Sequence, residues 1–436
     1  MTVNPGTTRR HAHATFRFLP VVSVRRMGKG AGMDDGSLMI SRRTALAGGA
    51  AGIGALLAAS VVPKAKAVRT GGIEATDLEV VTVTPTSVTF GFASYTAPHP
   101  AYGPLRPTVP TLGEVAMAPA DDPIAANDPV GSQALPGSAG SWIRPGMPDL
   151  PVVKASESET GFHLVTVDGL EPGREYAFEC RCDGIPATPG LMTTNLPGTP
   201  EISGRVTTLT PPPGEHVTTI AILNDTHIGE EKHGLILGDP WGEEFVPRQT
   251  MWRTDVGGLR VIGIDSSMLD ESGGRIEEAQ FEALEAELAA DPARPTLLMA
   301  HHPVTVEAAF TNVGTPAFTL NLDHSDRLQR MLAATPGAFL MAAGHTHRAR
   351  RTAPDAARNV DFVEFGSAAG YPGGYTLVHL HTGGYQVNFH RTGSPEALRW
   401  SSRSRWAMYG LNPEYTLGAT EHRNYVVHRD LSGLAR

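Results

Sequence analysis

Cysteine is nearly absent from this 436-residue chain, which contains only Cys180 and Cys182. The two stand two positions apart on an expected strand, so their side chains point to the same face without the geometry that a disulfide needs. A Cys-x-Cys pair can also bind a metal ion, but such sites use further cysteines that this chain lacks. We therefore expect a protein that makes no use of disulfides.

An excess of positive charge is also missing, because 45 acidic residues outnumber 36 lysines and arginines and give a net charge of −9. A nucleic-acid-binding protein needs a basic patch or stripe, so we expect no nucleic-acid scaffold role. The chain has neither internal repeats nor a glycine-rich loop that would cradle phosphate. Its hydrophobic content of 41% allows well-packed cores, and its length allows two domains and a tail.

Residues 1–67 have the composition of a targeting segment rather than of a domain. Arg42 and Arg43 precede an apolar stretch rich in glycine and alanine, and Ala65-Lys66-Ala67 supplies the small residues of a cleavage site. The segment resembles a twin-arginine export signal, which implies the export machinery as a partner and a periplasmic, cell-wall or secreted location. The alternative is an uncleaved anchor. The stretch is too short and too rich in small residues to anchor firmly as a spanning helix, so with the signal cleaved we expect no stable membrane span.

Residues 68–210 predict an all-β domain. Apolar and polar side chains alternate with period two, as in half-buried strands, at 78–83, 88–92, 162–167, 176–180 and 205–209. The stretch from 95 to 160 is rich in proline, glycine and alanine, so we expect long loops there.

The sequence Leu170-x-Pro172-Gly173-x-x-Tyr176 resembles the tyrosine corner of immunoglobulin-like and fibronectin type III-like sandwiches. The resemblance implies a sandwich of this kind over 68–210. Nothing in it has a catalytic pattern, so we expect a structural role rather than substrate binding.

A stiff linker, Pro211-Pro212-Pro213-Gly214, leads into a second domain over 211–400. Short apolar runs predict buried strands at 220–223, 259–264, 296–300 and 338–343, and 375–380 is expected to continue the same sheet. Core-facing stripes predict helices at 276–289 and 326–332. The tail, 401–436, is expected either to pack against the body or to be disordered.

Three of the expected strands end in residues that bind metals: Asp225 and His227 after the first, His301 after the second, and His345 and His347 after the third. Because these strands can share one sheet, whose carboxyl edge is where ligands bind, we expect the five residues to converge. Mixed oxygen and nitrogen ligation suits Zn, Mn, Fe or Co rather than Ca or Mg. A lone His-x-His is equally compatible with solvated loop histidines, but three such strand ends favour a metal site.

Asp-x-His, a later His-Pro strand end and Gly-His-x-His, in that order, resemble the calcineurin-like metallophosphoesterases, which include the purple acid phosphatases. The resemblance covers about 215–395. It implies an α/β (α+β) fold, a β-sandwich flanked by helices, with two Fe, Zn or Mn ions that generate a hydroxide for phosphoester hydrolysis. A sandwich domain in front of the phosphoesterase domain is also an arrangement that resembles the purple acid phosphatases. The substrate that the resemblance implies is a small-molecule or surface phosphoester.

The resemblance also implies a set of metal ligands. These are Asp225, His227 and His347 for one metal, and His301 and His345 for the other.

The family also has a Gly-Asp-x-x-Asp/Tyr block and a Gly-Asn-His-Asp/Glu block, and neither is present here. From His227 to Arg260 is 260 − 227 = 33 residues, too few for two strand-helix-strand crossovers of about 30 residues each. We therefore expect an internally shortened member that lacks the usual bridging carboxylate and general acid. Asp239 is a candidate replacement bridge. Asp265 is either a ligand or a loop cap, and His302 either faces substrate or is an ordinary loop histidine.

The sequence thus predicts an exported phosphoesterase that holds one metal per chain and hydrolyses slowly, with no catalytic acid identified. The alternative is a catalytically weak metal-binding or cell-surface interaction protein that acts through its N-terminal sandwich.

Overall fold

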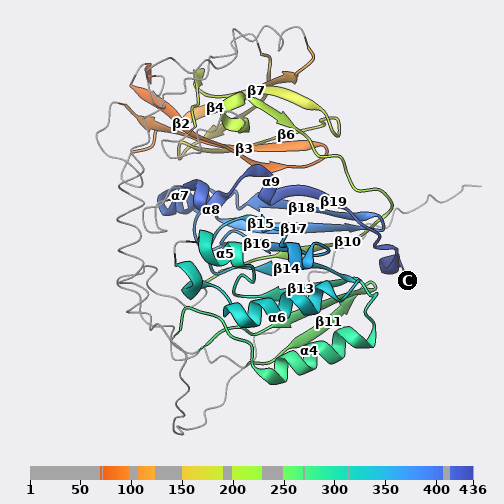
Figure 1. Cartoon of the computed structure of the whole chain (residues 1–436). Coiled ribbons are helices and arrows are strands. Elements are labelled where there is room, and N and C mark those ends of the chain that lie inside the picture. Colours follow the sequence, from red (N-terminus) through yellow and green to blue (C-terminus); the bar gives the residue numbers. More distant parts are fainter. Residues whose placement is uncertain are drawn as a thin grey trace, which may run out of the picture.

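The computed structural model describes residues 69–70, 72–97, 107–122, 150–189, 199–227, 249–268, 271–312, 314–405 and 413–435. In these ranges four β-sheets dominate and few helices are present, and the sheets form two sandwiches packed on each other (Figure 1). The predicted targeting segment and Asp239 lie outside the described residues. Among the residues described, no helix combines the length and the apolar character needed to cross a membrane.

The N-terminal sandwich packs two sheets around a core that includes Phe90, Phe178 and Val115. The first sheet contains, in spatial order, β1 (Arg69–Thr70), β2 (Ile73–Val83), β3 (Ser87–Thr96) and β6 (Phe162–Asp168). The second contains β5 (Val152–Ser158), β4 (Thr111–Pro119), β7 (Glu175–Cys182) and β8 (Ile185–Pro186), with β9 (Arg205–Thr207) paired to β7.

Two details of this sandwich confirm predictions. The backbone N–H of Glu171 donates a hydrogen bond to the Tyr176 hydroxyl at 2.9 Å, the contact that a tyrosine corner predicts. Cys180 and Cys182 both point into the core from β7, and neither is in a disulfide. The thiols therefore serve as small apolar core groups.

The prediction of long loops from 95 to 160 is wrong, because β4 and β5 lie in that stretch. β4 is buried along much of its length and so lacks a clear alternation of apolar and polar residues. It also contains Gly113, a residue type that weakens strands. A side chain at Gly113 would overlap the ring of His163, so the glycine is needed for close packing of the two sheets.

The second sandwich has a four-stranded and a six-stranded sheet, with Phe339, Val378 and Tyr385 in the core between them. The four-stranded sheet is antiparallel and contains β10 (His216–Ile222), β17 (Gly374–His381), β18 (Gly384–Arg391) and β19 (Asn424–His428). The six-stranded sheet contains, in spatial order, β11 (Trp252–Val256), β12 (Leu259–Ile264), β13 (Thr296–Ala300), β14 (Ala338–Ala343), β16 (Asp361–Glu364) and β15 (Arg350–Thr352). β19 comes from the predicted tail, which packs on the body by pairing with β18.

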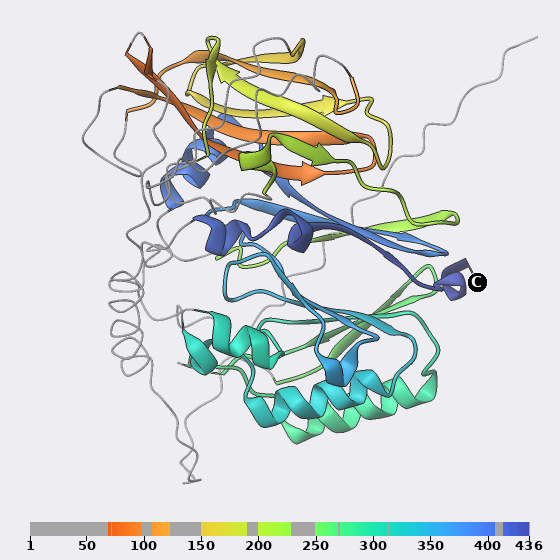
Figure 2. The same cartoon turned by 45° about the horizontal axis from the view of Figure 1, so that its top comes forward.

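The predicted helices are α4 (Glu278–Ala290) and α6 (Leu322–Ala333), which lie side by side over the outer face of the six-stranded sheet (Figure 2). α6 begins four residues earlier than predicted, because the Asn321 side chain accepts hydrogen bonds from two backbone N–H groups of its first turn. The shorter helices are α3 (Pro200–Ser203), α5 (Val306–Thr311), η2 (Thr315–Phe318), η3 (Asp355–Ala357), α7 (Pro395–Ser404), α8 (Pro413–Leu417), α9 (Thr420–Arg423) and η4 (Ser432–Ala435).

Two predictions about strands of the second sandwich are wrong. β17 does not continue the sheet of β14; it pairs with β10 and β18 in the opposite sheet. β10 is not a strand buried on both faces, since it is an edge strand whose only neighbour among the described strands is β17. Leu223, just after it, is 57% exposed. An apolar run alone does not distinguish an edge strand from a central one.

Candidate metal centre

All five predicted ligands come together at one edge of the second sandwich. His301 follows β13, and His345 and His347 follow the parallel neighbour β14. Asp225 and His227 follow β10, which belongs to the opposite sheet, so the expectation of a single shared sheet is wrong. The two sheets meet at this edge instead.

Asn224 joins the two sheets at this edge. Its side-chain amide donates to the carbonyl oxygen of Ala343 at 2.9 Å, and its own backbone forms a bridge with Ser367. The end of β10 is therefore fixed next to the end of β14.

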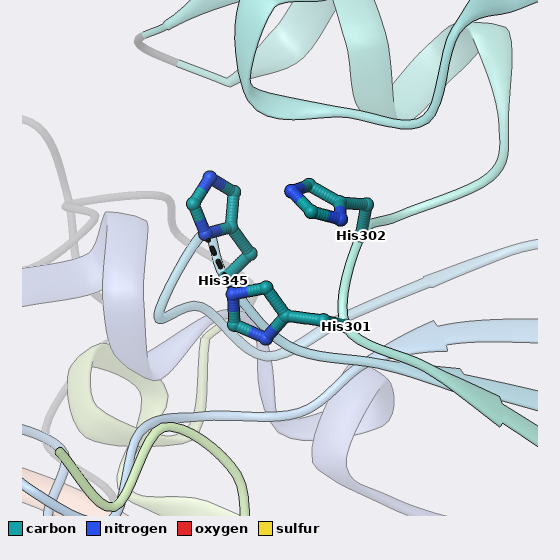
Figure 3. Close-up of side chains that lie close together, drawn as sticks. All are labelled: His301, His302 and His345. Atoms are coloured by element: carbon teal, nitrogen blue, oxygen red, sulfur yellow. Dashed lines mark hydrogen bonds between the residues drawn. The ribbon is translucent and has the colours of Figure 1, made fainter. Parts of the chain in front are cut away.

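The four histidines form two close pairs. His227 Nε2 lies 3.0 Å from His347 Nε2, and His301 Nε2 lies 2.9 Å from His345 Nδ1 (Figure 3 shows the second pair). Two imidazole nitrogens bound to one Zn²⁺ at 2.0–2.1 Å in tetrahedral geometry would be about 3.3 Å apart. Each pair is therefore within a few tenths of an ångström of the spacing that shared ligation requires.

The carboxylate of Asp225 lies between the two pairs. Its Oδ1 is 3.6 Å from His347 Nε2 and 3.8 Å from His301 Nδ1, and its side chain is 2% exposed. Both carboxylate oxygens accept from the backbone N–H of His345, at 3.0 and 3.1 Å. Any Cβ at Gly344 would come within 2.6 Å of Oδ2, so this position requires glycine.

Four of the five candidate ligands have a left-handed backbone: φ is 51° at Asp225, 48° at His227, 64° at His345 and 55° at His347. This region is uncommon for residues with a side chain, and each such residue costs about 1–3 kcal/mol. Outliers of this kind concentrate at functional sites, because the surrounding structure must compensate for them. Four left-handed residues at one sheet edge therefore favour a metal site there over a group of ordinary loop side chains.

A buried ion pair supports the turn that carries His345 and His347. Arg348 contacts Glu364 of β16 through Nε at 2.7 Å and Nη2 at 2.8 Å. The Thr346 hydroxyl donates to the same carboxylate at 2.5 Å. Burial lowers the pKa of Arg348, but the Glu364 charge and hydrogen bond outweigh it and the pKa is raised, so the guanidinium stays charged.

Burial lowers the pKa of both His301 and His345, and in each case the charge of a neighbouring histidine lowers it further. Both rings are therefore neutral near pH 7. Neutral imidazole has the lone pair that binds a metal. Four imidazoles around one buried carboxylate form a donor set that fits a borderline divalent or trivalent ion.

Sequence reasoning left His302 either facing substrate or as an ordinary loop histidine. His302 lies in the bend that follows β13, as the loop interpretation predicts, but its side chain is buried. The side chain is 2% exposed, its Nδ1 is 2.9 Å from the Ser266 hydroxyl, and its ring centroid is 4.7 Å from that of His345. Figure 3 shows the ring lying beside His345. Together with His301 and His345 it forms a group whose ligand atoms lie within 4.8 Å of one another. A Cβ at Gly274 would meet the His302 ring at 2.5 Å, so the ring is tightly enclosed.

Asp265 is a loop cap, as one of its two interpretations predicted. Its carboxylate accepts from the backbone N–H of Ser267 at 3.0 Å and of Gln249 at 2.9 Å. Gln249 is a residue that sequence reasoning missed. Its φ of 50° and its side-chain bonds to Ser267 and Gln280 tie the loop after β12 to α4. No pattern in the sequence marks it.

Comparison with protein-family models gives no match, and comparison with curated proteins gives none either. Among solved structures, a dimetal phosphatase from Danio rerio is 13% identical over 33% of this chain, with a TM-score of 0.26, and the chain spans 58% of its length. PhoD is 9% identical over 71% of this chain and 85% of its own, with a TM-score of 0.27. The sensor domain of the anti-sigma factor RsgI4 from Pseudobacteroides cellulosolvens is 9% identical over 33% of this chain and 99% of its own, with a TM-score of 0.18. At such scores the likeness is weak, and the chemistry of the site rests on its own residues.

Proposed function

We propose that this chain is an exported metal-dependent phosphoesterase, a shortened relative of the calcineurin-like enzymes with a fibronectin type III-like N-terminal sandwich. The observation that carries the proposal is the placement of the Asp225 carboxylate between two histidine pairs, each with the nitrogen spacing of shared metal ligands. The order of the three ligand motifs along the chain supports the same assignment.

A bound metal ion would supply Lewis acidity and a hydroxide nucleophile at neutral pH. Asp225, His227 and His347 would hold it, and His301 and His345 would face it from the other pair. The backbone N–H of His345 keeps the Asp225 carboxylate oriented toward the histidines. Burial lowers the pKa of His301 and His345, which keeps these two imidazoles neutral and able to ligate. No general acid is assigned.

We expect one tightly held metal per chain. Three protein ligands with an open fourth position suffice for a catalytic-type site, and Asp225, His227 and His347 provide them. A second ion would rest on imidazoles alone, those of His301 and His345 with His302 beside them, and would have no carboxylate of its own to offset its charge. Two cations about 4 Å apart repel each other by several kcal/mol, since one pair of unit charges at that distance already costs about 4 kcal/mol.

The test is hydrolysis of aryl phosphate mono- and diesters after reconstitution with Mn²⁺ or Zn²⁺. We expect slow, metal-dependent turnover that Asp225→Ala abolishes. A matched control is His379→Ala, a histidine on β17 that lies outside the histidine pairs. Metal binding without any turnover would contradict the enzyme and support the alternative of a metal-binding or surface interaction protein.

Export is tested independently of the site. If Arg42 and Arg43 are read by the twin-arginine machinery, the paired substitution to lysine should retain the protein in the cytoplasm. Cell fractionation with immunodetection measures this. Unchanged appearance outside the cytoplasmic membrane would rule out the twin-arginine route.

A further inference from the structure

One loop of the second sandwich, residues 367–373, contacts the backbone of Asp225 directly. The N–H of Ala369 donates to the Asp225 carbonyl oxygen at 3.2 Å, and the Ser367 hydroxyl donates to the same oxygen at 3.3 Å. The N–H of Ala368 donates to the carbonyl oxygen of Asn224 at 2.9 Å. These bonds fix the chain where Asp225 has a left-handed backbone.

The far end of the same loop reaches the N-terminal sandwich. The hydroxyl of Tyr371 donates to Glu79 of β2 at 2.6 Å. Glu79 is 2% exposed, and it also accepts from Arg391 of β18 and lies 2.7 Å from Arg405, just beyond α7. We call Glu79, Tyr371, Arg391 and Arg405 the interdomain cluster. Figure 1 shows β2 above β18, where the two sandwiches meet.

The charges of the interdomain cluster fix the direction of its hydrogen bonds. Burial raises the pKa of Glu79, but Arg405, Arg391 and the Tyr371 hydroxyl together outweigh it and lower the pKa, so the carboxylate is ionised. Burial and the Glu79 charge hold the pKa of Tyr371 well above its usual range, so the phenol keeps its proton. Tyr371 is therefore the donor and Glu79 the acceptor. Such charge-assisted bonds are about twice as strong as neutral ones.

The loop has little freedom between its two ends. Arg391 Nε donates to the carbonyl oxygen of Pro372 at 2.8 Å, and the Ser401 hydroxyl donates to it at 3.1 Å. The N–H of Tyr371 donates to the Ser404 hydroxyl at 2.8 Å. Arg391 reaches Glu79 across Gly91 of β3, where a Cβ would come within 2.9 Å of the guanidinium. The loop is therefore held to β18 and α7 between the end that contacts Asp225 and the end that contacts Glu79.

We propose that Glu79 and Tyr371 are positioning residues for the metal centre: the N-terminal sandwich holds loop 367–373, and the loop holds Asp225. The sandwich is then a structural part of the site rather than an attached module. We call this chain of contacts, from Glu79 through Tyr371 and loop 367–373 to Asp225, the relay. It exists in the protein without a metal ion, and only its effect on metal affinity rests on the proposed function.

The first test is hydrogen–deuterium exchange of the full chain without metal, comparing Tyr371→Phe with the matched variant Tyr385→Phe. Tyr385 is also a buried phenol that donates to a carboxylate, that of Asp361, but inside the second sandwich. We expect peptides covering 222–227 and 366–372 to exchange about fivefold faster in Tyr371→Phe, the effect of one lost hydrogen bond, and to be unchanged in Tyr385→Phe. Equal exchange in both variants would overturn the relay.

The second test is titration with Co²⁺, followed by its visible absorption. Outer-shell substitutions typically cost 10-fold or more in metal affinity, so we expect Tyr371→Phe to weaken Co²⁺ binding by about tenfold and to change the ligand-field spectrum. Tyr385→Phe should do neither, even if both variants melt at a lower temperature. Equal weakening in the two variants would show a general loss of stability and overturn the positioning role. A wild-type chain that binds no Co²⁺ while the exchange difference persists would refute the proposed function and leave the relay standing.

Discussion

At the scale of single residues, the site depends on how a few side chains and one glycine are placed. Asp225 was identified from the sequence because it ends an apolar run two residues before a histidine. Its position between both histidine pairs could not be identified in that way, since it depends on contacts between strands of different sheets. The burial of His302 was missed for the same reason.

Gly344→Ala should weaken metal binding without unfolding the protein. The added Cβ would lie 2.6 Å from Asp225 Oδ2 and so would push the carboxylate away from the histidines. We expect metal affinity to fall by about tenfold or more, measured by calorimetric titration with Zn²⁺. The control is Gly273→Ala, where the nearest atom would be 3.4 Å away. Equal Zn²⁺ affinities for the two variants would show that the contact between residue 344 and the Asp225 carboxylate does not affect metal binding.

At the scale of elements, the apolar runs located β12, β13 and β14 and the stripes located α4 and α6. β12 and β14 are buried along their whole length, as continuous apolar runs indicate, and α4 and α6 each bury one face. Periodicity failed for β4, which is buried on most of its length, and for the sheet partner of β17, which is a long-range choice. Strand pairing depends on contacts that no local pattern encodes.

The buried pair of Arg348 and Glu364 should matter far more than an exposed pair. Removing one partner of a buried ion pair leaves an uncompensated charge, so Glu364→Gln should lower the free energy of unfolding by about 3–5 kcal/mol. The matched control is Asp326→Asn, whose partner Arg330 is 64% exposed and whose loss should cost less than about 1 kcal/mol. Urea denaturation measures both. If the two variants lost similar amounts of unfolding free energy, the Arg348–Glu364 pair would not stabilise the turn that carries His345 and His347.

At the scale of the whole molecule, the two sandwiches share buried polar contacts. Besides the interdomain cluster, the Thr82 hydroxyl donates to the carbonyl oxygen of Phe389, and the Asn388 side chain donates to that of Val83. The sequence predicted a structural role for the N-terminal sandwich. It did not reveal how the two halves are joined, because Glu79 and Arg391 are 312 positions apart.

Glu79→Gln should destabilise the molecule in a pH-dependent way. The folded-state pKa of Glu79 lies below its ordinary value of 4.5, so its contribution is complete above about pH 4.5 and is lost as the pH falls through the folded-state pKa. We expect a loss of about 3 kcal/mol at pH 7 that shrinks in acid, because two buried arginines lose their counter-charge. Denaturation curves from pH 3 to pH 7 measure it. A difference that stayed constant with pH would contradict an ionised Glu79.

The most direct test of the metal centre is elemental analysis of the protein after equilibration with Zn²⁺. It compares the wild type with Asp225→Ala, His347→Ala and the double variant. We predict one zinc per wild-type chain, a similar loss in each single variant and little further loss in the double, because residues that share one ion act non-additively. Losses that multiply in the double variant, or a wild type that retains no zinc, would contradict the assignment of these residues to one metal site.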